Sequence, residues 1–142
     1  MLTYYGNKDI MKHQKTAFLC SQTIPADIVM KSYEWAVKQK VESNCIICGN
    51  HSQIEKDVFE ILLKGNQPLI LVLACAIYDK FSENITKAID DGRLLVISPF
   101  KSKSLRVSPF TAEIRNKLIL KLSDNIYIPY KRKGGMLERI TS

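Results

Sequence analysis

An unbroken apolar run over residues 68–76 constrains the fold of this chain more than any other segment. It reads Pro-Leu-Ile-Leu-Val-Leu-Ala-Cys-Ala and has no polar residue at alternate positions. A strand that is apolar on both faces is covered on both faces, which is typical of a parallel sheet. The run is also far shorter than the roughly 18 residues that a membrane span needs. It therefore predicts a central strand of an α/β domain.

Four further apolar runs alternate with helical patterns along the chain. The runs cover residues 16–21, 44–48, 94–97 and 125–128, and apolar residues recur at helical spacing in the segments between them. Pro25, Ser52 and Ser82 are placed to begin helices, and Glu55 completes a capping box with Ser52. Five strands with four intervening helices predict a Rossmann-like, doubly wound and mainly parallel sheet with helices on both faces.

No linker, internal repeat or low-complexity segment interrupts this pattern, so we expect a single domain over residues 1–142. Residues 1–14 are interpreted as a polar leader or an edge extension of the sheet, and residues 131–142 as a basic tail that turns at Gly134-Gly135. The polar start has no apolar stretch of the signal-peptide kind, which favours a cytoplasmic protein without membrane association.

The charge of the chain favours anionic partners. The formal net charge is +7, from 21 Lys and Arg against 14 Asp and Glu. A surplus of this size is typical of proteins that bind polyanions, among them nucleic acids and nucleotides. The basic residues are densest within 101–106 and 131–133.

The four cysteines are interpreted as buried, reduced thiols. Cys45 and Cys48 have the Cys-x-x-Cys spacing, but they lie inside a predicted strand, whereas a metal knuckle needs a turn between its ligands. We therefore expect no structural zinc. One alternative is a thiol–imidazole metal site that joins His51 to thiols at neighbouring strand ends, namely Cys20, Cys48 and Cys75.

Cofactor motifs are absent from the sequence. The loop after the first strand, residues 20–25, contains no glycine, so it lacks the Gly-x-Gly-x-x-Gly that a dinucleotide fold carries there. No Gly-Lys-Ser/Thr phosphate loop occurs either. We predict no cofactor. Any ligand site should lie at the carboxyl ends of the strands, in the loops 20–25, 48–53, 74–79, 98–109 and 129–135.

Arg115-Asn116-Lys117, followed by Leu122-Ser123-Asp124 before the last strand, is the sharpest motif of the chain. It resembles the Arg-Asn-Arg and Leu-Ser of the DNA-processing protein A (Smf) family, within the wider group that includes the lysine-decarboxylase-like LOG proteins. Looser matches are Cys48-Gly49 with Ile54-Glu55, and Gly134-Gly135. The sequence differs from the family after the first strand, where Cys20-Ser21-Gln22 stands in place of Gly-Ser-Arg.

The resemblance implies a Rossmann-like domain that binds single-stranded DNA, loads a RecA-type recombinase and forms a homodimer. Physically, we expect Arg115, Asn116 and Lys117 to begin a helix, where a guanidinium, an amide and the helix dipole favour phosphate. The alternative is that they are solvated first-turn charges and a local cap. The expected phosphate site comprises Gly49, Ser52, Arg115, Asn116, Lys117, Lys133, Gly134 and Gly135, with Tyr78 and Tyr130 as base-stacking candidates.

The leading hypothesis is therefore a non-enzymatic protein that engages single-stranded DNA along a basic crevice. The alternatives are a nucleotide-binding or nucleotide-processing protein of the LOG type, and a scaffold without a ligand. The LOG motif Gly-Gly-x-Gly-Thr-x-x-Glu is echoed only by Gly134-Gly135-Met136-Leu137-Glu138.

Overall fold

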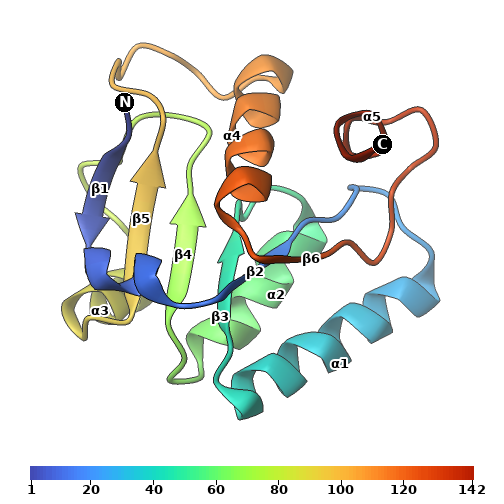
Figure 1. The fold of residues 1–142 in the computed structure, drawn as a ribbon, viewed down its shortest axis with the longest axis horizontal. Helices are drawn as coiled ribbons and strands as arrows, with labels where there is room; N and C mark the ends of the chain where they lie inside the picture. Colours follow the sequence, from blue (N-terminus) through green and yellow to red (C-terminus); the bar gives the residue numbers. More distant parts are fainter.

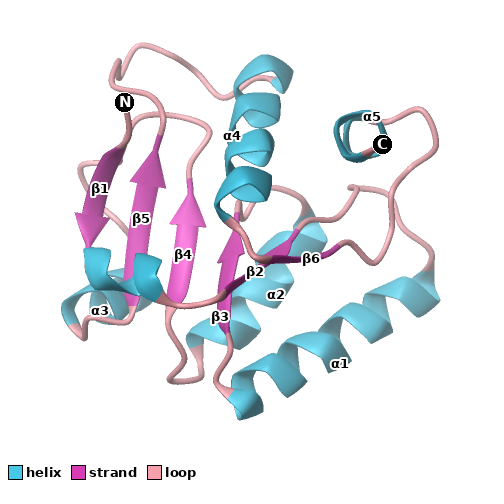
Figure 2. Cartoon of the chain, viewed as in Figure 1, coloured by secondary structure: helices cyan, strands magenta, loops and turns pink.

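Six strands form one sheet in the order β1-β5-β4-β3-β2-β6 (Figure 2). The computed structural model describes residues 1–142. The strands are β1 (Thr3–Gly6), β2 (Lys15–Phe18), β3 (Cys45–Cys48), β4 (Leu69–Val72), β5 (Leu94–Ser98) and β6 (Asn125–Tyr127). The five strands from β2 to β6 are parallel to one another, and β1 runs antiparallel along β5. The predicted fold class is thus confirmed.

Helices cover both faces of this sheet (Figure 1). One core cluster packs the sheet against α1 (Ala26–Glu42), α2 (Gln53–Leu63) and α3 (Glu83–Asp90). A second cluster packs the opposite face against the 3-10 helix η1 (Lys8–Lys12), α4 (Pro109–Leu122) and α5 (Met136–Thr141).

Strand β4 is buried on both faces, as its apolar run predicts. Leu69 and Leu71 belong to the first cluster, whereas Ile70 and Val72 belong to the second. The strand ends at Val72, however, and the remaining apolar residues of the run continue into the loop that follows. In β3 the same alternation places Cys48 in the first cluster and Cys45 in the second, so the two thiols lie on opposite faces of the sheet. The interpretation of both as buried strand residues is confirmed.

The chain reverses its direction across the sheet at β2. From β2 it proceeds outward through β3 and β4 to β5, and α4 then returns it to β6 on the other side of β2. This is the topological switch point of a doubly wound sheet, where the loops after two neighbouring strands diverge and leave room for a ligand. The loops that follow β2 and β6 therefore form the two sides of any ligand site.

The ends of the chain add an edge strand and a short helix to this core. Within residues 1–14, β1 pairs with β5 at the edge of the sheet, and Ile10 of η1 is buried. Helix α2 begins with the predicted capping box of Ser52 and Glu55. Ser82 precedes α3 but makes no side-chain capping bond. No helix combines the length and the apolar character that crossing a membrane would require.

Candidate functional site

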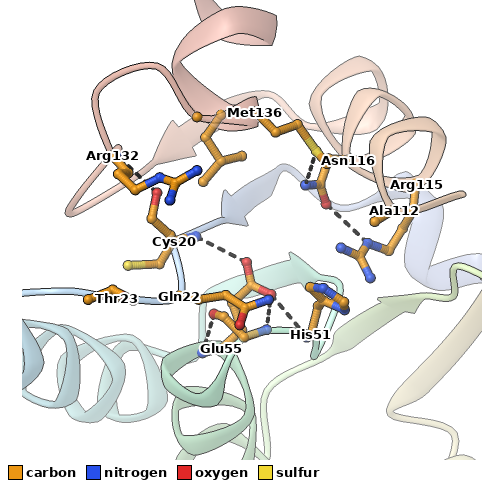
Figure 3. Close-up of a pocket in the computed structure, with 14 residues that line it drawn as sticks. Cys20, Gln22, Thr23, His51, Glu55, Ala112, Arg115, Asn116, Arg132 and Met136 are labelled. Carbon is orange, nitrogen blue, oxygen red and sulfur yellow. Dashed lines mark hydrogen bonds between the residues drawn. The ribbon is translucent and has the colours of Figure 1, made fainter. Parts of the chain in front are cut away.

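A crevice of about 390 Å³ opens at the switch point (Figure 3). Its walls come from four segments: the loop 20–23 after β2, the start of α2 with the residues before it, the middle of α4, and residues 132–137 after β6. The volume lies in the range of small-ligand sites in proteins. The site therefore lies at the expected edge of the sheet, and segments far apart in the sequence form it.

Arg115 is the dominant charge of the crevice. The residue is only 2% exposed, lines the crevice, and forms no ion pair with any acidic side chain. Its Nε donates to Oδ1 of the neighbouring Asn116 at 3.0 Å, and this is its single hydrogen bond. An arginine carries five N–H donors, so the terminal Nη1 and Nη2 atoms have no acceptor in the protein. Burial lowers the pKa of the guanidinium, while the negative charge of Glu55 opposes this shift.

A buried charge without a partner is costly, and in proteins such a group is normally paired or hydrogen-bonded. The side chain is almost completely enclosed, but Nη1 and Nη2 are not fully buried and open onto the crevice, so the free end of Arg115 has the character of an anion-binding group. The N–H fork of a guanidinium matches two oxygens of a phosphate or a carboxylate.

Glu55 fixes the floor of the crevice. One carboxylate oxygen accepts the backbone N–H of Cys20, and the other accepts those of His51 and Ser52, each at 3.0 Å. The side chain of Ser52 in turn accepts the Glu55 N–H, which completes the capping box. Three charge-assisted bonds thus hold the loop after β2 against the start of α2. The N–H groups of Cys20, His51 and Ser52 are thereby engaged and are not free for a ligand.

His51 contributes its imidazole ring to the wall below Arg115 (Figure 3). Partial burial lowers its pKa from the ordinary value, and the nearby positive charge of Arg115 lowers it further. Both effects disfavour the imidazolium form.

The segment after β6 closes the opposite side of the crevice. The Arg132 backbone N–H donates to the Ser21 hydroxyl at 2.8 Å, and Gly135 is the N-cap residue of α5. The amide of Asn116 donates to the Met136 sulfur at 3.5 Å. The bond between Asn116 and Met136 therefore links α4 to the segment after β6.

Four of the eight expected phosphate-site residues line the crevice, namely Ser52, Arg115, Asn116 and Gly135. Gly49 is buried directly beneath the Arg115 side chain. Lys117 is 59% exposed on the outer side of α4, where it pairs with Glu113 at 3.1 Å. Lys133 and Gly134 are exposed, and neither is among the residues that line the crevice.

The two base-stacking candidates lie outside the crevice lining. Tyr78 is half exposed and packs against Phe81 beside a separate hollow. Tyr130 contributes its backbone carbonyl, which accepts the Ser21 N–H at 3.2 Å.

The expectation that Arg115 begins a helix was wrong. Helix α4 begins at Pro109, where Ser108 and Thr111 form a capping box, so Arg115 lies half-way along it. Neither the dipole of a helix start nor the alternative of a solvated first-turn charge therefore applies to this residue. Arg115 is unusual because it is buried, and not because of its position in the helix.

Two charged side chains of the crevice, Arg132 and Glu55, were not among the predicted site residues. Arg132 lines it, whereas Lys133 was the residue chosen from the same basic group. Glu55 was recognised as a cap but not as the link to Cys20, because a contact across 35 positions leaves no local signal. The alternative of a metal site at His51 finds no support, since no three His, Cys, Asp or Glu side chains are placed together to hold an ion.

Comparisons with known proteins identify the fold. No family model and no curated protein matches the sequence. One similar structure is that of DNA processing protein A from Helicobacter pylori, which was described for its single-stranded DNA binding mode. It superposes on this chain with a TM-score of 0.73 at 18% sequence identity. DNA processing protein A from Streptococcus pneumoniae gives a TM-score of 0.73 at 21% identity. Both alignments cover 99% of this chain, but they span only 66% and 51% of the two other chains. The chain therefore has the Rossmann-like fold of DNA processing protein A.

Proposed function

We propose that this protein binds single-stranded DNA without catalysis, and that a backbone phosphate occupies the crevice at Arg115. The observation that carries the proposal is the Arg115 side chain, which is 2% exposed, is hydrogen-bonded only to Asn116, and keeps Nη1 and Nη2 open to the crevice. A phosphate would accept from its free N–H groups, and Arg132 on the opposite wall adds a second positive charge.

Two further observations support nucleic acid as the ligand. The net charge of +7 favours a polyanion over a single small anion. The Helicobacter pylori neighbour, which shares the fold, is a single-stranded DNA-binding protein. Because this chain spans 66% of that protein at 18% identity, the neighbour adds support but does not assign the activity.

The chemistry of the crevice favours binding over catalysis. Both carboxylate oxygens of Glu55 are engaged by backbone N–H groups, so this residue is poorly placed to take a proton from a substrate. Burial raises the pKa of the Cys20 thiol to about 12, and the charge of Glu55 raises it as well. A thiol of that pKa is almost never a thiolate at neutral pH, so it is a poor nucleophile.

A nucleotide is the second candidate ligand, because the crevice lies at the switch point where doubly wound domains bind mononucleotides. Affinity as a function of length separates the two. Fluorescence anisotropy with oligo-dT from one to about 12 nucleotides should show affinity that rises with length if a strand is bound. A plateau at one nucleotide would establish the nucleotide instead, and no binding at low salt would leave the scaffold hypothesis.

Arg115→Gln tests whether the crevice is the site. This variant keeps much of the side-chain volume but removes the charge, and we expect a loss of about 1.5–3 kcal/mol in binding. Lys38→Gln removes an exposed charge of α1 away from the crevice and serves as the control. Equal losses in the two variants would show that the strand does not use the crevice.

A homodimer, a RecA-type recombinase as partner and a cytoplasmic location follow from the family resemblance and remain predictions.

A further inference from the structure

We infer that Asn116 and Gly49 are positioning residues, which hold the Arg115 guanidinium and do not themselves bind the ligand. The inference rests on the proposed function of Arg115 as the phosphate-binding group. It assigns both residues a role that differs from the direct phosphate contact expected from the sequence.

The oxygen and the nitrogen of the Asn116 amide each make one hydrogen bond in the structure. The carbonyl Oδ1 accepts the Arg115 Nε–H at 3.0 Å, and Nδ2 donates to the Met136 sulfur at 3.5 Å. Figure 3 shows Asn116 between these two partners. A sulfur accepts hydrogen bonds but a guanidinium does not, so the two neighbours together orient the amide with its oxygen toward Arg115.

The bond to Asn116 selects one conformation of the arginine. Consecutive residues of a helix do not normally face each other, so the Arg115 side chain must turn toward its neighbour to form this bond. Because the guanidinium is planar and its donors form a rigid fork, fixing the Nε side determines where Nη1 and Nη2 lie. These two nitrogens are the ones left free for a phosphate.

Gly49 provides the space in which the arginine lies. A Cβ at this position would be 2.7 Å from Arg115 Nε, 3.0 Å from Cδ and 3.1 Å from Cζ. Atoms cannot pack this closely, so any side chain at residue 49 would displace the guanidinium. The glycine is thus required by the close approach of an arginine and not by its own backbone conformation, because its φ lies outside the left-handed region.

A double-mutant cycle distinguishes positioning from direct contact. The affinity for oligo-dT of about 12 nucleotides is measured for Asn116→Ala, Arg115→Gln and the double variant. We expect Asn116→Ala to weaken binding about tenfold alone and less than about twofold in the Arg115→Gln background, because it acts through the arginine. Equal losses in both backgrounds would overturn the inference for Asn116.

Gly49→Ala provides an independent second variant. It leaves every polar group in place, and we again expect a loss of about tenfold that vanishes when Arg115 is replaced. An affinity equal to that of the unmodified protein would overturn the inference for Gly49. Thermal unfolding verifies that each variant is folded. If either Asn116→Ala or Gly49→Ala fails to fold, the inference is tested with the other variant and with the NMR measurement described next.

An NMR measurement on the free protein separates this inference from the proposed function. The Arg115 Nε–H resonance, assigned by its loss in Arg115→Gln, should exchange slowly with solvent and should exchange much faster in Asn116→Ala. Unchanged exchange would overturn the positioning role even if DNA binds. Slow exchange without any affinity for oligo-dT would instead refute the proposed function and leave the contact established.

Discussion

The carboxylate of Glu55 accepts the backbone N–H of Cys20 at 3.0 Å, although the two residues are separated by 35 positions. The same carboxylate accepts the N–H groups of His51 and Ser52, so one side chain joins the loop after β2 to the start of α2. Both segments line the crevice, and this one side chain bonds them to each other.

Replacing Glu55 should therefore destabilise the protein strongly. Glu55→Ala leaves three backbone donors without their acceptor, and we expect the free energy of unfolding to fall by about 3 kcal/mol or more. Glu55→Gln should also lower the free energy of unfolding, because the amide nitrogen of glutamine would place its N–H donors against backbone N–H donors. Urea denaturation measures both changes. Glu60→Ala, at an exposed position of the same helix, is the control and should lie within about 0.5 kcal/mol of the unmodified protein. A similarly small change for Glu55→Ala would contradict the assigned role.

Thiol reactivity should follow burial. Burial raises the pKa of Cys45 to about 11 and that of Cys20 to about 12, and it raises the pKa of Cys48 as well. Cys75 is the only one of the four that is not buried. Because the thiolate is the reactive form, a thiol reagent at neutral pH should label one cysteine of the native protein rapidly and all four in denaturant. Mass spectrometry of the labelled protein identifies the site, and rapid labelling of Cys20, which lines the crevice, would show that the crevice opens far more than the structure indicates.

The pKa of His51 should respond to an anion in the crevice. Burial and the charge of Arg115 lower this pKa in the free protein. The unfolded chain therefore binds a proton at a higher pH than the native one, and stability should fall as the pH drops below about 6.5. A phosphate beside Arg115 would offset its charge and raise the pKa, so binding should tighten as the pH falls. An NMR titration of the ring with and without oligo-dT, assigned with His51→Gln, measures the shift. If the pKa of His51 were the same with and without oligo-dT, the phosphate would not be bound beside Arg115.

The architecture was predictable because local patterns determine it. The run in β4 is apolar at consecutive positions, and burial on both faces follows from that fact alone. The capping box of Ser52 and Glu55 gave the start of α2 for the same reason. The strand alternation that separates Cys45 from Cys48 likewise requires no knowledge of distant residues.

The candidate site was only partly predictable, since its geometry depends on contacts between distant segments. Arg115 lines the crevice, but its burial in the middle of α4 depends on the packing of this helix over the sheet, which no local pattern records. The three basic residues 131–133 are all exposed, but only Arg132 lines the crevice. A sequence pattern records which residues are basic, but not which of three neighbours borders a site formed by distant segments.

The last prediction uses this difference between neighbouring cations. For a single strand, the logarithm of the affinity falls with the logarithm of the salt concentration by about 0.7 for each neutralised phosphate. Arg132→Gln should reduce that slope by about 0.7, because Arg132 lines the crevice. Lys133→Gln should have a smaller effect, since its side chain is exposed outside the lining. Lys117→Gln should leave the slope unchanged, because Glu113 already pairs with this lysine. The measurement is the affinity for oligo-dT over a series of salt concentrations for the three variants. The losses should be the same for oligonucleotides of another base sequence, since phosphate contacts carry no sequence information. If Lys117→Gln reduced the slope as much as Arg132→Gln, the strand would run over the outer side of α4 and not through the crevice.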